Sequence, residues 1–190
     1  MRAVDEPNGA VVLVEGISDR VALETLAERR GRDLGAEGVA VVAIGGAQAI
    51  GRFLVELGPR GRNVKLAGLC DAGEERDFRR GIELAGVGSP ATRTEMEALG
   101  FYVCVTDLED ELIRALGADA VEEVVEAQRD LRPFRTMQRQ PAWRGHSREE
   151  QLHRFMGSGA RRKIRYARLL VDALDLTRVP EPLDRVLAHV

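Results

Sequence analysis

Short apolar runs recur along the first hundred residues, and segments with helical spacing separate them. The runs cover residues 9–14 (GAVVLV), 39–44 (VAVVAI), 64–70 (VKLAGLC) and 101–105 (FYVCV). Runs of this length, rich in β-branched residues, predict buried strands, whereas apolar residues spaced three and four apart predict helices. Strands that alternate with helices pair in parallel through right-handed crossovers. The sequence therefore predicts an α/β fold with a mainly parallel sheet flanked by helices.

The strand signals stop after residue 105. Helices are expected downstream at residues 119–132, 148–156 and 161–174. An irregular, Pro-containing segment is expected at 135–145, between the first two of these helices. Upstream, residues 81–99 contain Gly, Ser and Pro and predict a loop with a short helix that starts near Thr92 or Thr94. We therefore expect an α/β core over residues 1–118 and a helical, Arg-rich C-terminal extension over residues 119–190 that packs on it.

The composition is that of a soluble globular protein of ordinary size. The 190 residues are 44% hydrophobic and 31% charged, and no apolar run approaches the ~18 residues needed to cross a bilayer. Without a signal-peptide pattern, a cytoplasmic protein without membrane contact is expected. Cys70 and Cys104 adjoin predicted strands and are expected to be reduced core thiols. The usual zinc-ligand spacings are missing, so any metal should be a hard ion bound by oxygen.

The net charge of −3 hides an uneven distribution. Residues 129–168 carry twelve Lys and Arg but only three acids, so the rest of the chain is strongly acidic. Such a division suits a protein that binds cations at one place and a polyanion at another, although a charged segment can also be a solvated helix face. Nucleic acid is the partner that this basic segment favours.

Acidic residues follow three of the predicted strands. Glu15 ends the first run and Asp19 lies four residues on, Asp71 ends the third run, and Asp107 and Glu109 follow the fourth. Taken singly, these acids have simpler explanations as helix caps, an acidic loop or a favourable helix N-terminus. The carboxyl ends of parallel strands share one edge of the sheet, however. Together the acids predict a site for a divalent cation.

The same residues resemble the motifs of a known family. Residues 14–19 (VEGISD) resemble the Glu-Gly-x-x-Asp opening of Toprim domains, and Gly45-Gly46 resembles the glycine turn after their second strand. Residues 107–112 (DLEDEL) resemble a Leu-Glu-x-x-Leu segment of the OLD (overcoming lysogenization defect) nuclease subgroup, and Lys163 resembles that subgroup's late lysine. The resemblance covers residues 11–116 well and the remainder loosely.

The resemblance implies a Toprim-like fold and a nuclease that cleaves DNA, or as second choice RNA, with Mg²⁺ or Mn²⁺. An ATPase domain precedes the Toprim domain in full-length OLD proteins, so this chain resembles a stand-alone form whose ATPase partner would be encoded separately. The implied metal ligands are Glu15, Asp19, Asp71, Asp107 and Glu109. The implied catalytic residues are Glu15, Asp71 and Lys163. The expected nucleic-acid contacts are Arg161, Arg162 and Lys163.

One position departs from the family pattern. Toprim domains usually follow the third strand with Asp-x-Asp, whereas Asp71 is followed here by Ala72 and Gly73. Either Glu74 or Glu75 takes the vacant position, or one metal site is weak or absent. Besides the nuclease, two functions stay open. One is a catalytically silent Toprim module that binds nucleic acid or a partner protein, and the other is a phosphotransferase or phosphatase on small nucleotides.

Several nearby residues are expected to be structural only. His146 and His153 lie in the Arg-rich segment and are expected to be surface residues without a catalytic role. The Gly45-Gly46 pair is expected to form a tight turn in preference to a phosphate-binding nest. Phe155 and Tyr166 are expected to supply the hydrophobic contacts of the basic segment. The sequence leaves the oligomeric state open.

Overall fold

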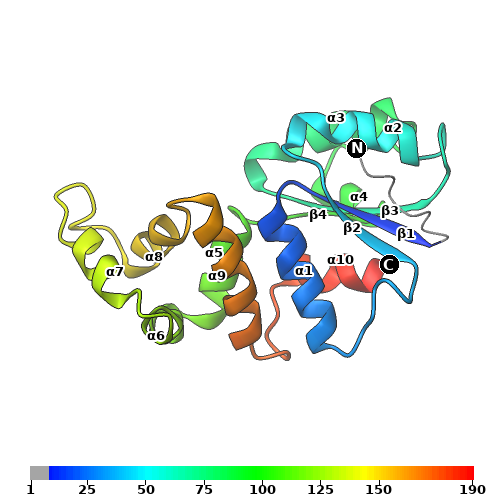
Figure 1. Cartoon of the computed structure of the whole chain (residues 1–190). Helices are drawn as coiled ribbons and strands as arrows, with labels where there is room; N and C mark the ends of the chain where they lie inside the picture. Colours follow the sequence, from blue (N-terminus) through cyan, green and yellow to red (C-terminus); the bar gives the residue numbers. More distant parts are fainter. Residues whose placement is uncertain (1–8) are drawn as a thin grey trace.

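The computed structural model describes residues 9–190. Figure 1 shows two adjoining parts: a parallel sheet covered by helices on both faces, and a lobe made of helices alone that lies beside one end of the sheet. Among the described residues, no helix is both long and apolar enough to cross a membrane.

Four parallel strands form one sheet in the order β2-β1-β3-β4. The strands are β1 (Ala10–Val14), β2 (Val39–Ala43), β3 (Lys65–Cys70) and β4 (Phe101–Val103). β1 pairs with a strand on each side, and all five of its residues are buried. Val14, the last residue of β1, is in register with Leu69, the next-to-last residue of β3, so the two strands end within one residue of each other. The residues that follow these two strands therefore emerge at the same edge.

One face of the sheet is covered by the second and third crossovers. Their elements are the 3₁₀ turn η1 (Ala47–Ala49), α2 (Ile50–Leu57), the 3₁₀ turn η2 (Ala72–Glu74), α3 (Glu75–Leu84) and α4 (Arg93–Ala98). Figure 1 shows α2 and α3 side by side above the sheet. Apolar residues of these helices pack with Val11 and Leu13 of β1 in one core. Thr92 caps α4, because its side chain accepts the Glu95 N–H at 3.2 Å.

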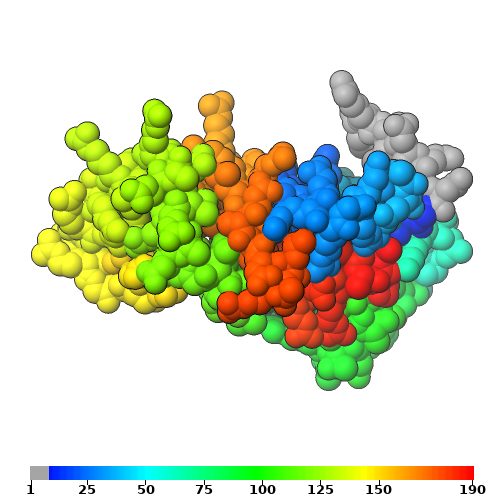
Figure 2. All heavy atoms as spheres, turned by 90° about the horizontal axis from the view of Figure 1, so that it is seen from below, coloured from blue at the N-terminus to red at the C-terminus, as the bar shows by residue number. Residues whose placement is uncertain are grey.

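The opposite face is covered by α1 (Ile17–Arg29) and α10 (Glu181–His189), and α9 (Ala160–Ala173) packs beside α1. In Figure 2, α9 in orange lies against α1 in blue. The β1 side chains of this face, Val12 and Val14, pack in a second core with residues of all three helices. Arg29 strengthens the contact, because its Nη1 donates to the Val171 and Leu174 carbonyls, both at 2.7 Å. The first and last parts of the chain thus share one core.

The helical lobe consists of α9 together with α5 (Leu108–Leu116), α6 (Ala118–Ala127), α7 (Leu131–Gln138) and α8 (Arg148–Met156). Its centre is aromatic: the Phe155 ring lies edge-on to Phe134 and Tyr166, with centroid distances of 5.3 and 6.3 Å. All three rings are buried. The hydrophobic role predicted for Phe155 and Tyr166 is therefore confirmed.

Gly68 allows two neighbouring strands to pack closely. A Cβ added at Gly68 would lie 2.7 Å from Cδ1 of Phe101 and 3.1 Å from the Leu13 carbonyl oxygen. These distances are shorter than ordinary carbon contacts, so a larger residue would displace the Phe101 ring or the backbone. The packing inside the sheet therefore requires a glycine here.

The predicted α/β fold with a parallel sheet is confirmed, and the four strands lie where the apolar runs placed them. The helix expected at 119–132 is wrong at its end, since α6 stops at Ala127 and Arg129 adopts a left-handed backbone with φ of 61°. The irregular segment expected at 135–145 is also partly wrong, because α7 reaches Gln138. Pro133 lies in the first turn of α7, where its missing N–H is not needed.

Two further elements differ from the sequence-based expectation. α3 continues to Leu84, into a segment expected to be a loop, and α10 was not expected at all. α10 packs on β3 and β4, so the last residues of the chain complete the cover of the sheet. The boundary between an α/β core and a helical extension at residue 118 stays a prediction.

Candidate metal-binding site

Glu15 and Asp71 follow the two central strands and lie next to each other. The Asp71 backbone N–H donates to Glu15 Oε1 at 3.0 Å. The backbone carbonyl of Glu15 accepts the N–H groups of Gly45 and Gly46 at 3.0 and 3.2 Å, and these glycines have φ of 79° and 115°. The glycine pair is therefore a tight turn that holds Glu15, as expected, and its N–H groups are already used.

Asp19 reaches the same edge of the sheet from the first turn of α1. Its Oδ2 accepts the Gly16 N–H at 2.8 Å, so the side chain caps the helix as the simpler explanation proposed. The residue is only 8% exposed. An ionised carboxylate has about four lone-pair sites, so the cap leaves capacity for a further partner.

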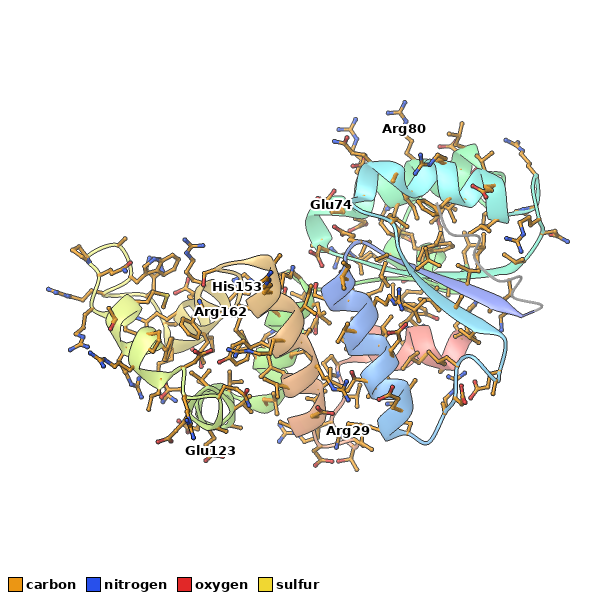
Figure 3. All side chains as sticks on the ribbon, viewed as in Figure 1. Arg29, Glu74, Arg80, Glu123, His153 and Arg162 are labelled. Atoms are coloured by element: carbon orange, nitrogen blue, oxygen red, sulfur yellow. The ribbon has the colours of Figure 1, made fainter. Side chains whose placement is uncertain are left out.

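A pocket of about 330 Å³ opens at this edge of the sheet. It lies where the β1–α1 turn, the end of β3 and the first turn of α9 meet. Its charged lining residues are Glu15, Asp19, Asp71 and Lys163. Figure 3 shows Glu74, at the end of the sheet layer, facing the lobe that carries His153 and Arg162. Three carboxylates and one ammonium group thus border one space.

Asp107 and Glu109 come from the start of α5 and lie outside the lining of this pocket. Asp107 caps α5: its Oδ1 accepts the Asp110 N–H at 2.9 Å, and its Oδ2 lies 2.6 Å from His153 Nε2. Glu109 is 3% exposed, and its Oε2 lies 3.0 Å from Lys163 Nζ. Lys163 therefore joins the acids of α5 to the acids of the pocket.

The carboxyl groups around the pocket resist ionisation. Burial, together with the neighbouring Glu15 and Asp19 carboxylates, raises the pKa of Asp71 to about 8. Burial also raises the pKa of Glu15 and of Asp19 above their ordinary values. For Glu109, burial outweighs the ion pair with Lys163, so its pKa is raised as well. A bound cation would reverse this because it favours the ionised forms.

Two groups shift toward their charged forms. Burial alone would lower the pKa of Lys163, but the surrounding carboxylates, Glu109 first, raise it above its ordinary value. Burial alone would raise the pKa of Asp107, but the hydrogen bond with His153 lowers it below its ordinary value. The site therefore keeps one firm positive charge, on Lys163, among the acids.

The donors suit a hard divalent cation held loosely by the protein. Glu109 Oε1 is buried and has no hydrogen-bond partner among the described residues, a costly state unless something binds it. Across residues 9–190, however, no three His, Cys, Asp or Glu side chains are arranged to ligate one ion. Mg²⁺ keeps several waters and needs only one or two carboxylates. The residues are therefore better suited to a largely hydrated ion than to an ion fully enclosed by protein ligands.

Position 73 lacks a carboxylate but has room for one. A Cβ added at Gly73 would meet no atom within 4 Å. Glu75 cannot act as a substitute, because it is ion-paired with Arg79 and, at 2.8 Å, with Arg93. Glu74 adds to the effect of burial in raising the pKa of Glu15, so its charge is felt at the site. Of the two candidates for the vacant position, Glu74 is the one that the structure favours.

The three predicted nucleic-acid contacts share the first turn of α9 but have different surroundings. Lys163 lines the pocket. Arg162 donates to Ser158 Oγ at 2.6 Å, and its guanidinium lies 4.3 Å from the centre of the Phe155 ring. Arg161 is exposed. Only Lys163 is therefore placed beside the acids.

Fold and site together define a class of protein: a parallel α/β domain whose sheet edge gathers acids from the ends of successive strands, with a lysine supplied by a later helix. Residues 9–71 match the model of one family of this class, the overcoming lysogenization defect protein-like TOPRIM domain. Over these residues the chain is similar to the OLD-like Toprim family. Toprim domains generally bind divalent metals such as Mg²⁺, and the family is generally associated with metal-dependent nucleases.

Solved structures share the fold over nearly the whole chain. The C-terminal region of the Xanthomonas campestris pv. campestris OLD protein, phased with platinum, is 24% identical with a TM-score of 0.74, over 95% of this chain and 91% of that chain. The C-terminal region of the Burkholderia pseudomallei OLD protein is 21% identical with a TM-score of 0.71, over 94% of each chain. No curated protein matches the chain.

Sequence reasoning missed His153. It was expected to be a surface residue without a role, but its side chain is half-buried and bonds to Asp107. The two residues lie 46 positions apart and meet because α8 packs on α5. No local pattern could have revealed this pair. Cys70 and Cys104 are buried and free, as predicted.

Proposed function

We propose that this chain is a metal-dependent nuclease that hydrolyses phosphodiester bonds, with DNA as the favoured substrate. The observation that carries the proposal is the pocket shared by Glu15, Asp19, Asp71 and Lys163. Clustered carboxylates with raised pKa values favour binding of a cation, whereas a charged lysine beside them favours binding of an anion. A metal ion and a phosphate group together satisfy both requirements in one space.

The acids would divide the work of holding the metal. Glu15 and Asp71 would be the principal ligands of Mg²⁺ or Mn²⁺, because both follow central strands and the Asp71 N–H donates to the Glu15 carboxylate. When bound, the ion supplies a Lewis acid and a more acidic water. The supporting residues would be Asp19, Asp107 and Glu109.

Lys163 would bind the phosphate. Its ammonium group is fixed by Glu109 on one side and borders the pocket on the other. From this position it would donate hydrogen bonds to phosphate oxygens and neutralise charge that builds up during cleavage. Arg161 and Arg162, which share the first turn of α9 with Lys163, would contact neighbouring phosphates. Phosphate contacts position a nucleic acid without reading its sequence, so base specificity should be low.

The test is the Glu15→Gln variant, which keeps the size of the side chain but removes its charge. We expect Mg²⁺- or Mn²⁺-dependent cleavage of plasmid and linear DNA to be abolished, while binding of DNA stays close to that of the wild type. The matched control is Glu28→Gln, an exposed position on α1, the helix that follows Glu15, and away from the pocket, which should cleave normally. Wild-type cleavage by Glu15→Gln would refute the assignment of catalysis to this pocket.

A catalytically silent Toprim module is the second candidate, and two observations favour it. Gly73 occupies the position of the second aspartate, and no three-ligand metal group exists among the described residues. If the wild-type protein binds DNA but cleaves none of a set of duplex, single-stranded and RNA substrates with either metal, this candidate replaces the nuclease.

A further inference from the structure

The basic residues of the helical lobe fall into two groups. Arg135, Arg148, Arg165 and Arg168 each form an ion pair with an acid: Glu122 for Arg135, Asp119 and Glu122 for Arg148, Asp130 for Arg165, and Asp172 for Arg168. In contrast, no described acid lies within ion-pair distance of a second group, made up of Arg129, Arg132, Arg139, Arg144, Arg154, Arg161 and Arg162. Ion pairing within the lobe therefore does not explain the second group.

Four of these seven arginines, Arg139, Arg144, Arg154 and Arg162, make contacts that do not neutralise them. Arg144 Nη2 donates to the Arg139 carbonyl at 3.3 Å, and Arg139 Nε donates to the Arg135 carbonyl at 3.2 Å. The Arg154 guanidinium lies 5.7 Å from the centre of the Trp143 ring. Carbonyl oxygens and aromatic rings orient a guanidinium but leave its full charge in place.

The linked arginines lead toward the pocket. Arg154 and His153 are adjacent on α8, and His153 bonds to Asp107. The next residue, Phe155, carries the Arg162 guanidinium on its ring, and Lys163 follows Arg162 in the first turn of α9. That turn contains no acid, although acids are the residues that a helix N-terminus favours. Arg154, Arg162 and Lys163 thus mark a basic route from α8 to the pocket, while the acids of α8, Glu149 and Glu150, lie in its first turn.

We propose that Arg139, Arg144 and Arg154 form an outlying phosphate-binding surface, the lobe-tip surface, which holds the backbone of a nucleic acid whose scissile phosphate lies at Lys163. Figure 1 shows the α7–α8 loop in yellow at the far end of the lobe. This inference rests on the proposed function and extends it, because it places bound nucleic acid across α8, a helix roughly 10 Å wide, before the strand reaches the acids. A polyanion suits the surface because uncompensated guanidinium groups at close range repel one another until an anion binds.

The lobe-tip surface should bind nucleic acid through the charge of its phosphates, independently of the base sequence. Guanidinium groups on phosphates release counterions, so each contact contributes about 0.9 to the slope of log affinity against log salt on duplex DNA. The triple variant Arg139→Ala, Arg144→Ala, Arg154→Ala should therefore flatten that slope by roughly 2 to 3 units. The measurement is binding of a labelled duplex at several salt concentrations with EDTA present, so it does not depend on cleavage.

The matched control is the variant Arg129→Ala, Arg132→Ala, Arg178→Ala. These arginines are also exposed, and removing them changes the net charge equally. Arg132 and Arg139 lie at opposite ends of α7, roughly 10 Å apart at 1.5 Å per residue. The control should keep the wild-type slope within half a unit or so. Replacing the three lobe-tip arginines with Lys instead of Ala should also keep it, which separates loss of charge from damage to the loop.

Two results would overturn the proposal. An unchanged slope in the lobe-tip alanine variant, or an equal change in the control, would show that the lobe-tip surface makes no phosphate contacts. Poly-glutamate that displaces DNA at equal charge concentration would assign the surface to an acidic protein segment instead. Loss of cleavage alone bears on the metal site and leaves this binding result intact, so failure of the proposed function and failure of this inference can be told apart.

Discussion

Lys163 offers the sharpest test of how the site is built, because it borders the pocket and pairs with a nearly fully buried acid, Glu109. In the variant Lys163→Met, Glu109 would keep its charge with neither oxygen partnered, since Oε2 loses the ammonium group and Oε1 has no partner already. Breaking a buried pair typically costs 3–5 kcal/mol. The Lys163 side chain is 36% exposed, so solvent screening reduces the expected coupling between the two residues to about 1–2 kcal/mol.

A double-mutant cycle measures this coupling. Urea unfolding of the metal-free protein would be followed for Lys163→Met, Glu109→Gln and the double variant. We expect Lys163→Met to cost about 1–2 kcal/mol less in the Glu109→Gln background, because the uncompensated charge is gone. For a chain of this size the difference corresponds to a shift in Tm of about 2–8 °C. Added Mg²⁺ should reduce the loss of unfolding free energy in Lys163→Met, since a bound ion replaces the lost positive charge.

The chain's other lysine supplies the control. Lys65 is exposed at the start of β3, so Lys65→Met removes the same charge at little cost, within about 0.5 kcal/mol. A coupling energy indistinguishable from zero would refute the reasoning, because it would mean that Lys163 does not stabilise Glu109 in solution. The role of Lys163 at the phosphate would then lose its structural support.

Three other predictions follow from the same geometry. Gly73→Asp should tighten Mn²⁺ binding measured by calorimetry, since the position has room for a side chain; unchanged affinity would show that this turn does not face the metal. The pKa of Asp71 is raised to about 8 in the folded protein, so the metal-free protein should lose stability as pH rises from about 4 to about 8. Over this range Asp71 is ionised in the unfolded chain but still largely protonated in the folded one. Asp71→Asn should remove that part of the pH dependence, and a variant with the wild-type profile would contradict it. Gly68→Ala should cost about 1–3 kcal/mol through overpacking against Phe101, whereas an unchanged urea midpoint would mean that the ring moves freely.

The sheet and its acidic edge could be predicted because both depend on local signals. A parallel strand buried on both faces must be a continuous apolar run, and the residue that follows it must lie at the carboxyl edge. Glu15 and Asp71 therefore came from the pattern alone. That both residues lie at one edge could be expected, but their strands are neighbours only because of the strand order, and the Asp71 N–H donates to Glu15 because of the register of β1 with β3.

The rest of the site depends on tertiary packing that no local pattern encodes. Whether Lys163 pairs with Glu109 is decided by where α9 lies against α5, and the same holds for His153 and Asp107. The charge excess of residues 129–168 was visible in the sequence, but which arginines are neutralised was not. Helix boundaries failed around Pro133: the predicted helix ended at residue 132, whereas α7 runs from Leu131 to Gln138 with the proline in its first turn, where a helix stays intact.

The packing of α9 against α1 also has a consequence for the order of events during synthesis. Glu15 and Asp71 leave the ribosome long before Lys163, and the core beneath β1 is incomplete until residues of α9 and α10 arrive. At about 5–20 residues per second, the 92 positions from Asp71 to Lys163 correspond to a delay of roughly 5 to 20 seconds. A nascent chain would therefore carry its acids without the cation that accompanies them.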